Sequence, residues 1–385
     1  MYAERVHDNA QSDDLLSRVA LYDADGSRRA LWQSVGHVVV RAPAGADIAL
    51  VSPVSAANPV ETTRSLGTGQ VTVALPPGSY VVTVAMPGRV EVHAPVLVER
   101  NREIAIEITP PLADDVPPGF IYIPAGEFLF GVANEQDRRT WFVTTPLRRR
   151  STAAFLIGRT EVTFGEWLAY VDALPASERA IRLPNVPTKI SGSLSISPDD
   201  TGHWKLELQP EDHRYAAGWD QPFVYPGRAA QSVQDWRRFP VTGISASDAS
   251  AYAVWLDRTG RVPGARLCTE VEWERAARGA DGRDYPSGRW PEPSDANVDV
   301  THGPGLMGPD EVGSHPASTS PFGLVDMSGN AFEFTVSETG GYILRSGSYQ
   351  HDRKTAHLAN RSAINSMVRD AALGFRLCAT PPLPR

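Results

Sequence analysis

The chain has 385 residues, of which 42% are hydrophobic and 21% charged, a balance typical of a soluble globular protein of about two domains. A formal net charge of −8 argues against nucleic acid as a general partner, because phosphate binding needs a basic field. No apolar run is long enough for a transmembrane helix, which excludes membrane insertion, and no signal-peptide core begins the chain, so the expected location is cytoplasmic.

The first third of the chain has a β pattern. After a weakly periodic N-terminal segment, 1–30, short β-branched runs are separated by turns that contain Pro and Gly. The runs lie at 38–40, 47–51, 70–75, 80–84 and 103–108. In the last run, Ile104, Ile106 and Ile108 alternate and should share one face. The pattern predicts a small antiparallel β-sandwich over 31–112, followed by a Pro-rich, acidic linker at 113–119.

The rest of the chain, 120–385, has more loop than regular structure, yet it carries three strong helix signals. Thr163 with Glu166, Ser245 with Asp248, and Thr269 with Glu272 all have the spacing of a capping box. In a capping box these side chains satisfy free N–H groups of the first helical turn. The pattern predicts three helices within a domain of α+β class, with a long insert at 185–240 that contains a strand over 203–208.

A polar loop run near the C-terminus, 349–370, is hung between short apolar strand signals, and such loops commonly carry binding or catalysis. Its side chains are predicted to form a ligand-binding face. The residues assigned to this face are Tyr349, Gln350, His351, Asp352, Arg353, Asn360, Arg361, Asn365 and Arg369.

An ordered set of motifs over roughly 117–380 resembles the formylglycine-generating enzyme, or sulfatase-modifying factor, family. The motifs include 121–131, 161–163, 266–274, 276–279, 323–330, 332–335 and 374–376. The resemblance implies an irregular C-type-lectin-like fold. The Pro-Pro-Gly-Ser-Tyr turn at 76–80 resembles PEGA-type sandwich modules. Because such domains also occur fused to protein kinases, a kinase or other signalling module is a candidate partner.

The chain departs from this family at the catalytic positions. Family oxidases bind copper through two cysteines, and the positions that match them hold His351 and Ala356. Because Cu(I) prefers thiolates, no copper is expected there. The resemblance therefore favours a catalytically silent domain that binds a protein or peptide through 349–370. In the same family, variable proteins of diversity-generating retroelements carry a hypervariable ligand-binding face at this run, and a role of that kind is an alternative.

A metal-dependent oxidase with other ligands is a further alternative. His351, His357 and Asp352 could form a two-histidine, one-carboxylate set for iron, or a histidine could hold copper. No catalytic acid is carried over from the family; Asp299 and Asp310 are only guesses at one. The resemblance also implies calcium near Asn297, Asn330 and Glu333, whose oxygen atoms suit this ion.

The two cysteines, Cys268 and Cys378, lie in motifs that the family fold brings together at the base of the domain. The resemblance implies that they are close in space. Either a disulfide or a pair of buried thiols would satisfy that placement, so both remain open.

Overall fold

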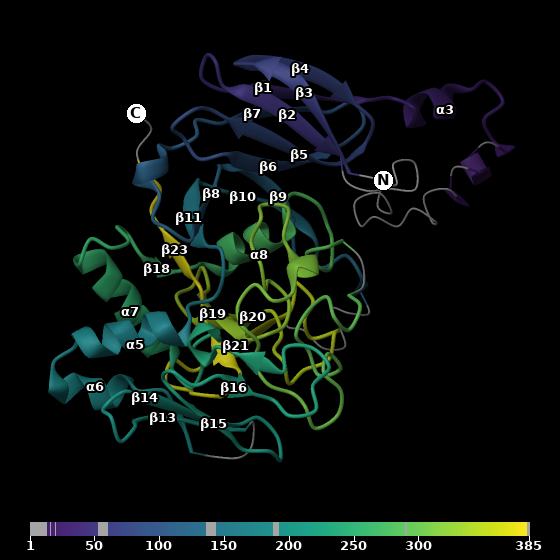
Figure 1. Ribbon diagram of the computed structural model, residues 1–385. Helices are drawn as coiled ribbons and strands as arrows, with labels where there is room; N and C mark the ends of the chain where they lie inside the picture. The colour runs from purple at the N-terminus through teal and green to yellow at the C-terminus, as the bar shows by residue number, and fades with distance from the viewer. Residues whose placement is uncertain are drawn as a thin grey trace.

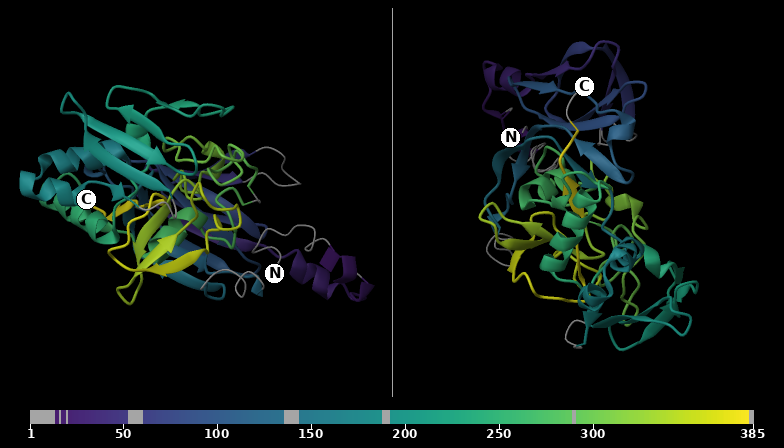
Figure 2. Two further views of the ribbon diagram at one scale, coloured as in Figure 1. Left: turned by 90° about the horizontal axis from the view of Figure 1, so that it is seen from below. Right: turned by 90° about the vertical axis from the view of Figure 1, so that its left-hand side faces the viewer.

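The protein consists of a β-sandwich and a larger C-terminal domain, seen at the top and bottom of the computed structural model in Figure 1. The structure describes residues 14–15, 17–19, 21–52, 61–135, 144–187, 192–288 and 291–382. Both the layered sheets and the few short helices agree with the predicted α+β class. The side view in Figure 2 shows the last, yellow segment of the chain returning from the C-terminal domain towards the sandwich.

Two sheets pack face to face in the sandwich, after a short helix α3 (Ser27–Trp32). One sheet has the order β4-β1-β7 and the other β3-β2-β5-β6. The strands are β1 (Gly36–Arg41), β2 (Asp47–Ser52), β3 (Thr62–Thr68), β4 (Gln70–Leu75), β5 (Gly78–Ala85), β6 (Val92–Val98) and β7 (Glu103–Glu107). The prediction of a purely antiparallel sandwich was wrong in one place, because β7 pairs with β1 in parallel. This requires a crossover from one sheet to the other before β7, which local periodicity does not encode.

The predicted helices of the C-terminal domain are all present, and each begins at its capping box. They are α5 (Phe164–Ala173), α7 (Ala246–Arg258) and α8 (Glu270–Arg278), and α6 (Ala176–Arg182) follows α5. In α8, for example, the Thr269 hydroxyl accepts from the Glu272 N–H while the Glu272 carboxylate accepts from the Thr269 N–H. None of the helices in the described ranges is long and apolar enough to cross a bilayer.

Short strands and loops make up most of the C-terminal domain. Three four-stranded sheets have the orders β18-β23-β11-β8, β12-β13-β14-β15 and β21-β20-β19-β22. The strands of these sheets are β8 (Phe120–Ile123), β11 (Phe155–Gly158), β12 (Asn185–Val186), β13 (Ser193–Pro198), β14 (Trp204–Gln209), β15 (Tyr215–Gly218), β18 (Arg266–Leu267), β19 (Phe332–Val336), β20 (Tyr342–Arg345), β21 (Arg361–Ile364), β22 (Leu373–Gly374) and β23 (Leu377–Ala379). The pairs β9 (Gly126–Phe130) with β10 (Arg148–Thr152), and β16 (Phe223–Val224) with β17 (Val233–Gln234), complete the set. The strand predicted in the insert is β14, and it forms the centre of a hairpin sheet.

A disulfide joins Cys268 to Cys378 at the base of the domain, with their Cα atoms 4.8 Å apart. Both residues are fully buried, beside Trp273 and Leu324. The expected proximity of the two cysteines is confirmed, and of the two states left open the structure contains the disulfide.

The sandwich and the C-terminal domain meet through both polar and apolar contacts. Arg102 of the sandwich pairs with Glu127 of β9 at 2.7 Å, and Ser79 donates to Asp281 at 2.6 Å. An apolar cluster beside these contacts contains Leu97, Leu129 and Ala280. The contacts hold β6 and β7 next to the start of the C-terminal domain.

Candidate functional site

The first part of the polar run lies in the loop 346–360, which connects β20 to β21, and an arginine at each end of this loop fastens it to α8. Arg345 at the end of β20 is fully buried and donates to Glu274 at 2.5 Å and to the Leu358 carbonyl at 2.6 Å. Arg361 at the start of β21 makes a bidentate pair with Glu270, at 2.8 and 2.9 Å. The loop 346–360 is therefore held tightly against the domain core.

Two residues assigned to the ligand-binding face, Tyr349 and Asn360, are buried within this loop and not exposed as expected. Tyr349 is 0% exposed, and its hydroxyl donates to the Ala371 carbonyl at 3.2 Å. Burial raises the pKa of that phenol well above its usual value. Asn360 is 7% exposed and donates to the Ser346 and Thr355 carbonyls. Both side chains hold the loop together rather than meeting a ligand.

His351 lies in a partly enclosed position at the start of the loop. Its Nδ1 is 2.8 Å from the Ser348 hydroxyl, and its ring meets the Phe332 ring edge-on with centroids 4.8 Å apart. Burial lowers the pKa of the imidazole, although nearby carboxylates including Asp370 act in the opposite direction. The lowered pKa favours the neutral imidazole.

The other two residues of the predicted iron set face different partners. His357 lies 3.0 Å from Asp284 through Nε2, and its Nδ1 accepts from the Ala359 N–H. Asp352 is exposed and caps the following turn, accepting from both the backbone and the hydroxyl of Thr355. Across the described ranges, no three His, Cys, Asp or Glu side chains are grouped so that they could hold a metal ion. The structure does not bring His351, His357 and Asp352 together as an iron site.

A copper site of two thiolates does not fit these residues either. Ala356, at the second of the two positions, is fully buried in a small apolar cluster with Ala296 and Val298. The chain has only two cysteines, and both are consumed in the disulfide. No thiolate is left to bind copper at this loop.

The three predicted calcium ligands are divided between two clusters. Asn297 and Asn330 meet, since Nδ2 of Asn297 donates to Oδ1 of Asn330 at 3.1 Å. Glu333 instead accepts from Arg376 through both oxygens and from Trp273 Nε1, each at 2.7 Å. Because its charge and both oxygens are already matched by cationic and N–H donors, Glu333 does not fit as a calcium ligand. Calcium at Asn297 and Asn330 stays a prediction.

A buried cluster around Asp310 lies beside the two asparagines. Both His302 and His315 approach Asp310 Oδ2, at 2.8 and 2.9 Å, and Arg228 donates to Oδ1 at 2.8 Å. His315 also has its Nδ1 3.1 Å from the Ser294 carbonyl. Both ring nitrogens of His315 thus face acceptors, an arrangement that favours the doubly protonated imidazolium. Asp310 was only a guess at a catalytic acid. The segment around it has no periodic pattern, so its contacts with His302 and His315 could not be predicted from the sequence.

The second half of the run differs from the first because it is exposed. β21 is the edge strand of its sheet, and its residues Ser362 and Ala363 are both exposed. In the following turn, Met367 is 69% and Val368 39% exposed. No described strand pairs with the outer edge of β21. This edge and turn, 361–368, are called the β21 surface below.

Most remaining residues of the predicted face hold the β21 surface or the loop in place. Arg369 donates to the carbonyls of Ile181 and Leu183 and pairs with Asp248 at 2.7 Å, which anchors the turn to α6 and α7. Asn365 is exposed and accepts from the Met367 N–H. Gln350 and Arg353 donate to the carbonyls of Pro210 and Pro291. Met367 and Val368 lie within the predicted run but were not among the residues assigned to the face, although their apolar side chains stand out in a polar sequence.

The chain is similar in sequence to a known protein family and in structure to a solved member of the same fold. Residues 108–381 match the model of the sulfatase-modifying factor enzyme 1-like domain. The formylglycine-generating enzyme of Mycobacterium tuberculosis is 29% identical over 244 residues, covering 56% of this chain and 73% of the relative. Mouse inactive C-alpha-formylglycine-generating enzyme 2 is 27% identical over 291 residues, covering 70% and 88%. The structure of PvdO from Pseudomonas aeruginosa has the same fold, with 20% identity, a TM-score of 0.50 and coverage of 68% and 94%.

Proposed function

This chain belongs to the sulfatase-modifying factor enzyme 1-like family, and we propose that it acts as a polypeptide-binding module without the oxidase chemistry of the family. Its similarity both to a formylglycine-generating enzyme and to a relative named inactive means that membership alone does not decide activity. The proposal that the chain lacks oxidase chemistry therefore rests on the residues of the loop 346–360. Both cysteines are in the disulfide, and the candidate metal ligands in the described ranges are separated.

The observation that carries the proposal is the β21 surface. The free edge of a β-strand presents backbone N–H and C=O groups that another extended chain can pair with. Beside that edge, Met367 and Val368 expose apolar side chains, and methionine adapts readily to different partners. Together these features fit an extended polypeptide that adds a strand and places an apolar side chain on the turn.

The charges around the β21 surface favour an apolar segment rather than a highly charged one. Arg361 and Arg369 are the cationic groups that flank it, and each is already paired, with Glu270 and Asp248 respectively. A strongly acidic ligand would have to compete with those buried carboxylates. Backbone pairing and apolar contact are thus expected to provide most of the affinity.

Selection from a displayed library of random peptides on the folded protein tests this function. We expect selected peptides to have alternating apolar residues and to bind the Ala363→Lys variant at least tenfold more weakly, since an exposed lysine on an edge strand opposes strand addition. Leu31→Asp is the control, because Leu31 is 61% exposed on α3, which lies beside the sandwich and away from β21 in Figure 1. Equal binding of selected peptides by the wild type and Ala363→Lys would contradict the proposal.

A further inference from the structure

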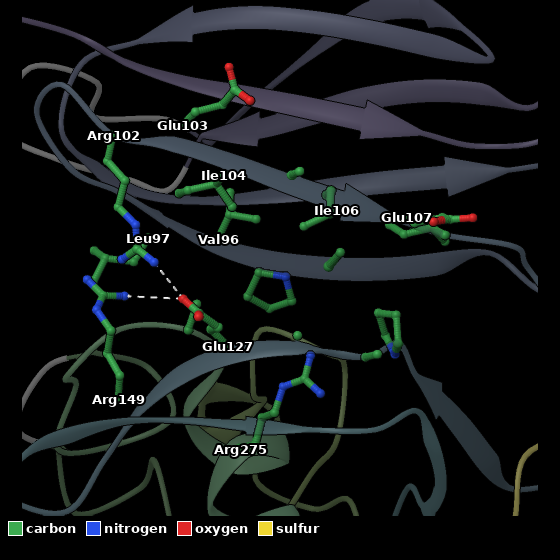
Figure 3. A pocket seen from close by; sticks show the side chains of 18 residues that line it. Val96, Leu97, Arg102, Glu103, Ile104, Ile106, Glu107, Glu127, Arg149 and Arg275 are labelled. Carbon is green, nitrogen blue, oxygen red and sulfur yellow. Dashed lines mark hydrogen bonds and ion pairs between the residues drawn. The ribbon is translucent and has the colours of Figure 1, made fainter.

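A cavity lies at the junction between the two domains, away from the β21 surface. It has a volume of about 450 Å³ and is lined by β6 and β7 of the sandwich and by residues 124–127, Arg149 and Arg275 of the C-terminal domain (Figure 3). This volume is within the range of small-molecule sites, roughly 300–1,000 Å³. Nothing in the proposed function uses this cavity.

The sandwich supplies a mostly apolar wall because two sheet edges meet there. β6 ends one sheet and β7 ends the other, so the space between their edges opens towards the sandwich core. Val96, Ile104 and Ile106 line this wall and lie on the strands above the cavity in Figure 3. An apolar group placed against these side chains would be removed from water, which is favourable.

The C-terminal domain supplies one buried cation, Arg275 of α8, which points up towards the sandwich in Figure 3. Arg275 is 4% exposed, and its Nη1 donates to the Thr152 hydroxyl. Within the described ranges, its guanidinium has no carboxylate within ion-pair distance, whereas Arg102 and Arg149 share Glu127 at 2.7 and 3.7 Å. Burial lowers the pKa of Arg275 to about 10, which still leaves it charged at neutral pH. A buried cation without a counter-ion is costly and would gain from an anionic partner.

The backbone next to Arg275 leaves room for its guanidinium. A Cβ atom at Gly126 would lie only 2.7 Å from Nη2 of Arg275. The glycine therefore permits the guanidinium to reach the cavity lining. A side chain at this position would have to displace the guanidinium.

We propose that this cavity binds a monocarboxylate carried on an apolar body, with the carboxylate on Arg275 and the apolar body against Val96, Ile104 and Ile106. The planar guanidinium matches a carboxylate with two parallel N–H···O bonds. Glu103 and Glu107 are exposed on β7 along the cavity and disfavour a ligand with more negative charge, such as phosphate. Because the carboxylate partner and the apolar wall belong to different domains, the ligand bridges them.

Calorimetric titration of the full chain with hexanoate tests the site, with hexan-1-ol as a neutral probe of similar shape and inorganic phosphate as a polyanion. We expect hexanoate to bind at least tenfold more tightly than hexan-1-ol, and phosphate not to compete. Arg275→Met should weaken hexanoate binding at least tenfold. Arg102→Met, which removes a cavity arginine already paired with Glu127, should change it less than threefold.

A second variant, at the exposed residue Ala125, tests the site even if Arg275→Met fails to fold. Ala125 is exposed and lines the cavity, so Ala125→Trp should occlude it and abolish hexanoate binding without removing Arg275. N-acetyl-Ile-Val and its C-terminal amide identify the source of the carboxylate. If N-acetyl-Ile-Val binds but its amide and hexanoate do not, the site is assigned to a polypeptide C-terminus. Equal affinity for hexanoate and hexan-1-ol, unchanged binding in Ala125→Trp, or no binding of either carboxylate would overturn the proposal.

Discussion

The two halves of the run between β20 and β22 use similar polar residues for different purposes. In the loop 346–360, Tyr349 and Asn360 are buried and bonded to backbone carbonyls, whereas in the β21 surface Met367 and Val368 face solvent. The first half is packed into the domain core. The second half retains an open strand edge. The comparison shows that a rigid, buried loop lies directly beside an exposed strand edge.

The disulfide should contribute to the stability of the C-terminal domain and not to peptide binding at the β21 surface. It closes a loop of 110 residues at the base of the domain, so the double variant Cys268→Ala/Cys378→Ala is expected to lose about 4–5 kcal/mol of unfolding free energy in the chain-entropy model. Urea unfolding measures this loss. Where the variant remains folded, its affinity for selected peptides should match the wild type, and a tenfold loss would show that the base and the β21 surface are coupled.

Breaking the attachment of the loop to α8 should have a slightly smaller effect on stability. Arg345→Met leaves Glu274 buried with its charge less well matched, and removing one partner of such a pair costs about 3–5 kcal/mol. Arg258→Met is the control, because Arg258 is exposed at the end of α7 and should change the unfolding free energy by less than about 0.5 kcal/mol. Similar costs for the two variants, measured by urea unfolding, would mean that the loop is not held as described.

Removing an apolar contact from the β21 surface should leave stability alone and reduce binding. Met367→Asp places a charge where a partner is expected to bury the side chain, so selected peptides should bind at least tenfold more weakly, about 1.4 kcal/mol or more. The melting temperature should be unchanged because Met367 contributes little to the core. Fluorescence titration of labelled peptide gives the affinity, and an unaltered value would exclude Met367 from the interface.

The smallest effect is expected from pH. Burial lowers the pKa of His315, but the hydrogen bond and charge of Asp310 outweigh it and raise that pKa above its usual value. A group whose pKa is raised by folding contributes stability that is present below its unfolded pKa and is lost as pH rises through the folded one. The unfolding free energy should therefore fall from pH 6 to pH 8 more in the wild type than in His315→Gln. If the unfolding free energies of the two proteins change with pH in parallel, His315 is not the protonated group described.

The helices could be predicted because their determinants are local. Thr163 and Ser245 meet partners three residues away, so the same capping boxes appear in the sequence and in the structure. The family motifs similarly located the paired cysteines. The sandwich was foreseen from alternation, but the parallel pairing of β7 depends on a crossover between sheets that alternation does not record.

The candidate site was predicted less well because burial depends on contacts distant in the chain. Tyr349 and Asn360 have polar groups that suggested a surface, while the structure turns them towards the carbonyls of Ala371 and Ser346. Glu333 was assigned to calcium from a motif, but its charge is matched by Arg376, 43 residues later. The Asp310 cluster joins side chains from loops without periodic pattern, so its composition alone carried no signal.

Hydrogen exchange of the backbone amides, measured with and without a selected peptide, tests the central claim most directly. If the protein binds polypeptide by strand addition, slowed exchange should concentrate at 361–368, with little change in the already buried loop 346–360. Protection centred on His351 and the loop 346–360, with β21 unaffected, would contradict strand addition at the β21 surface.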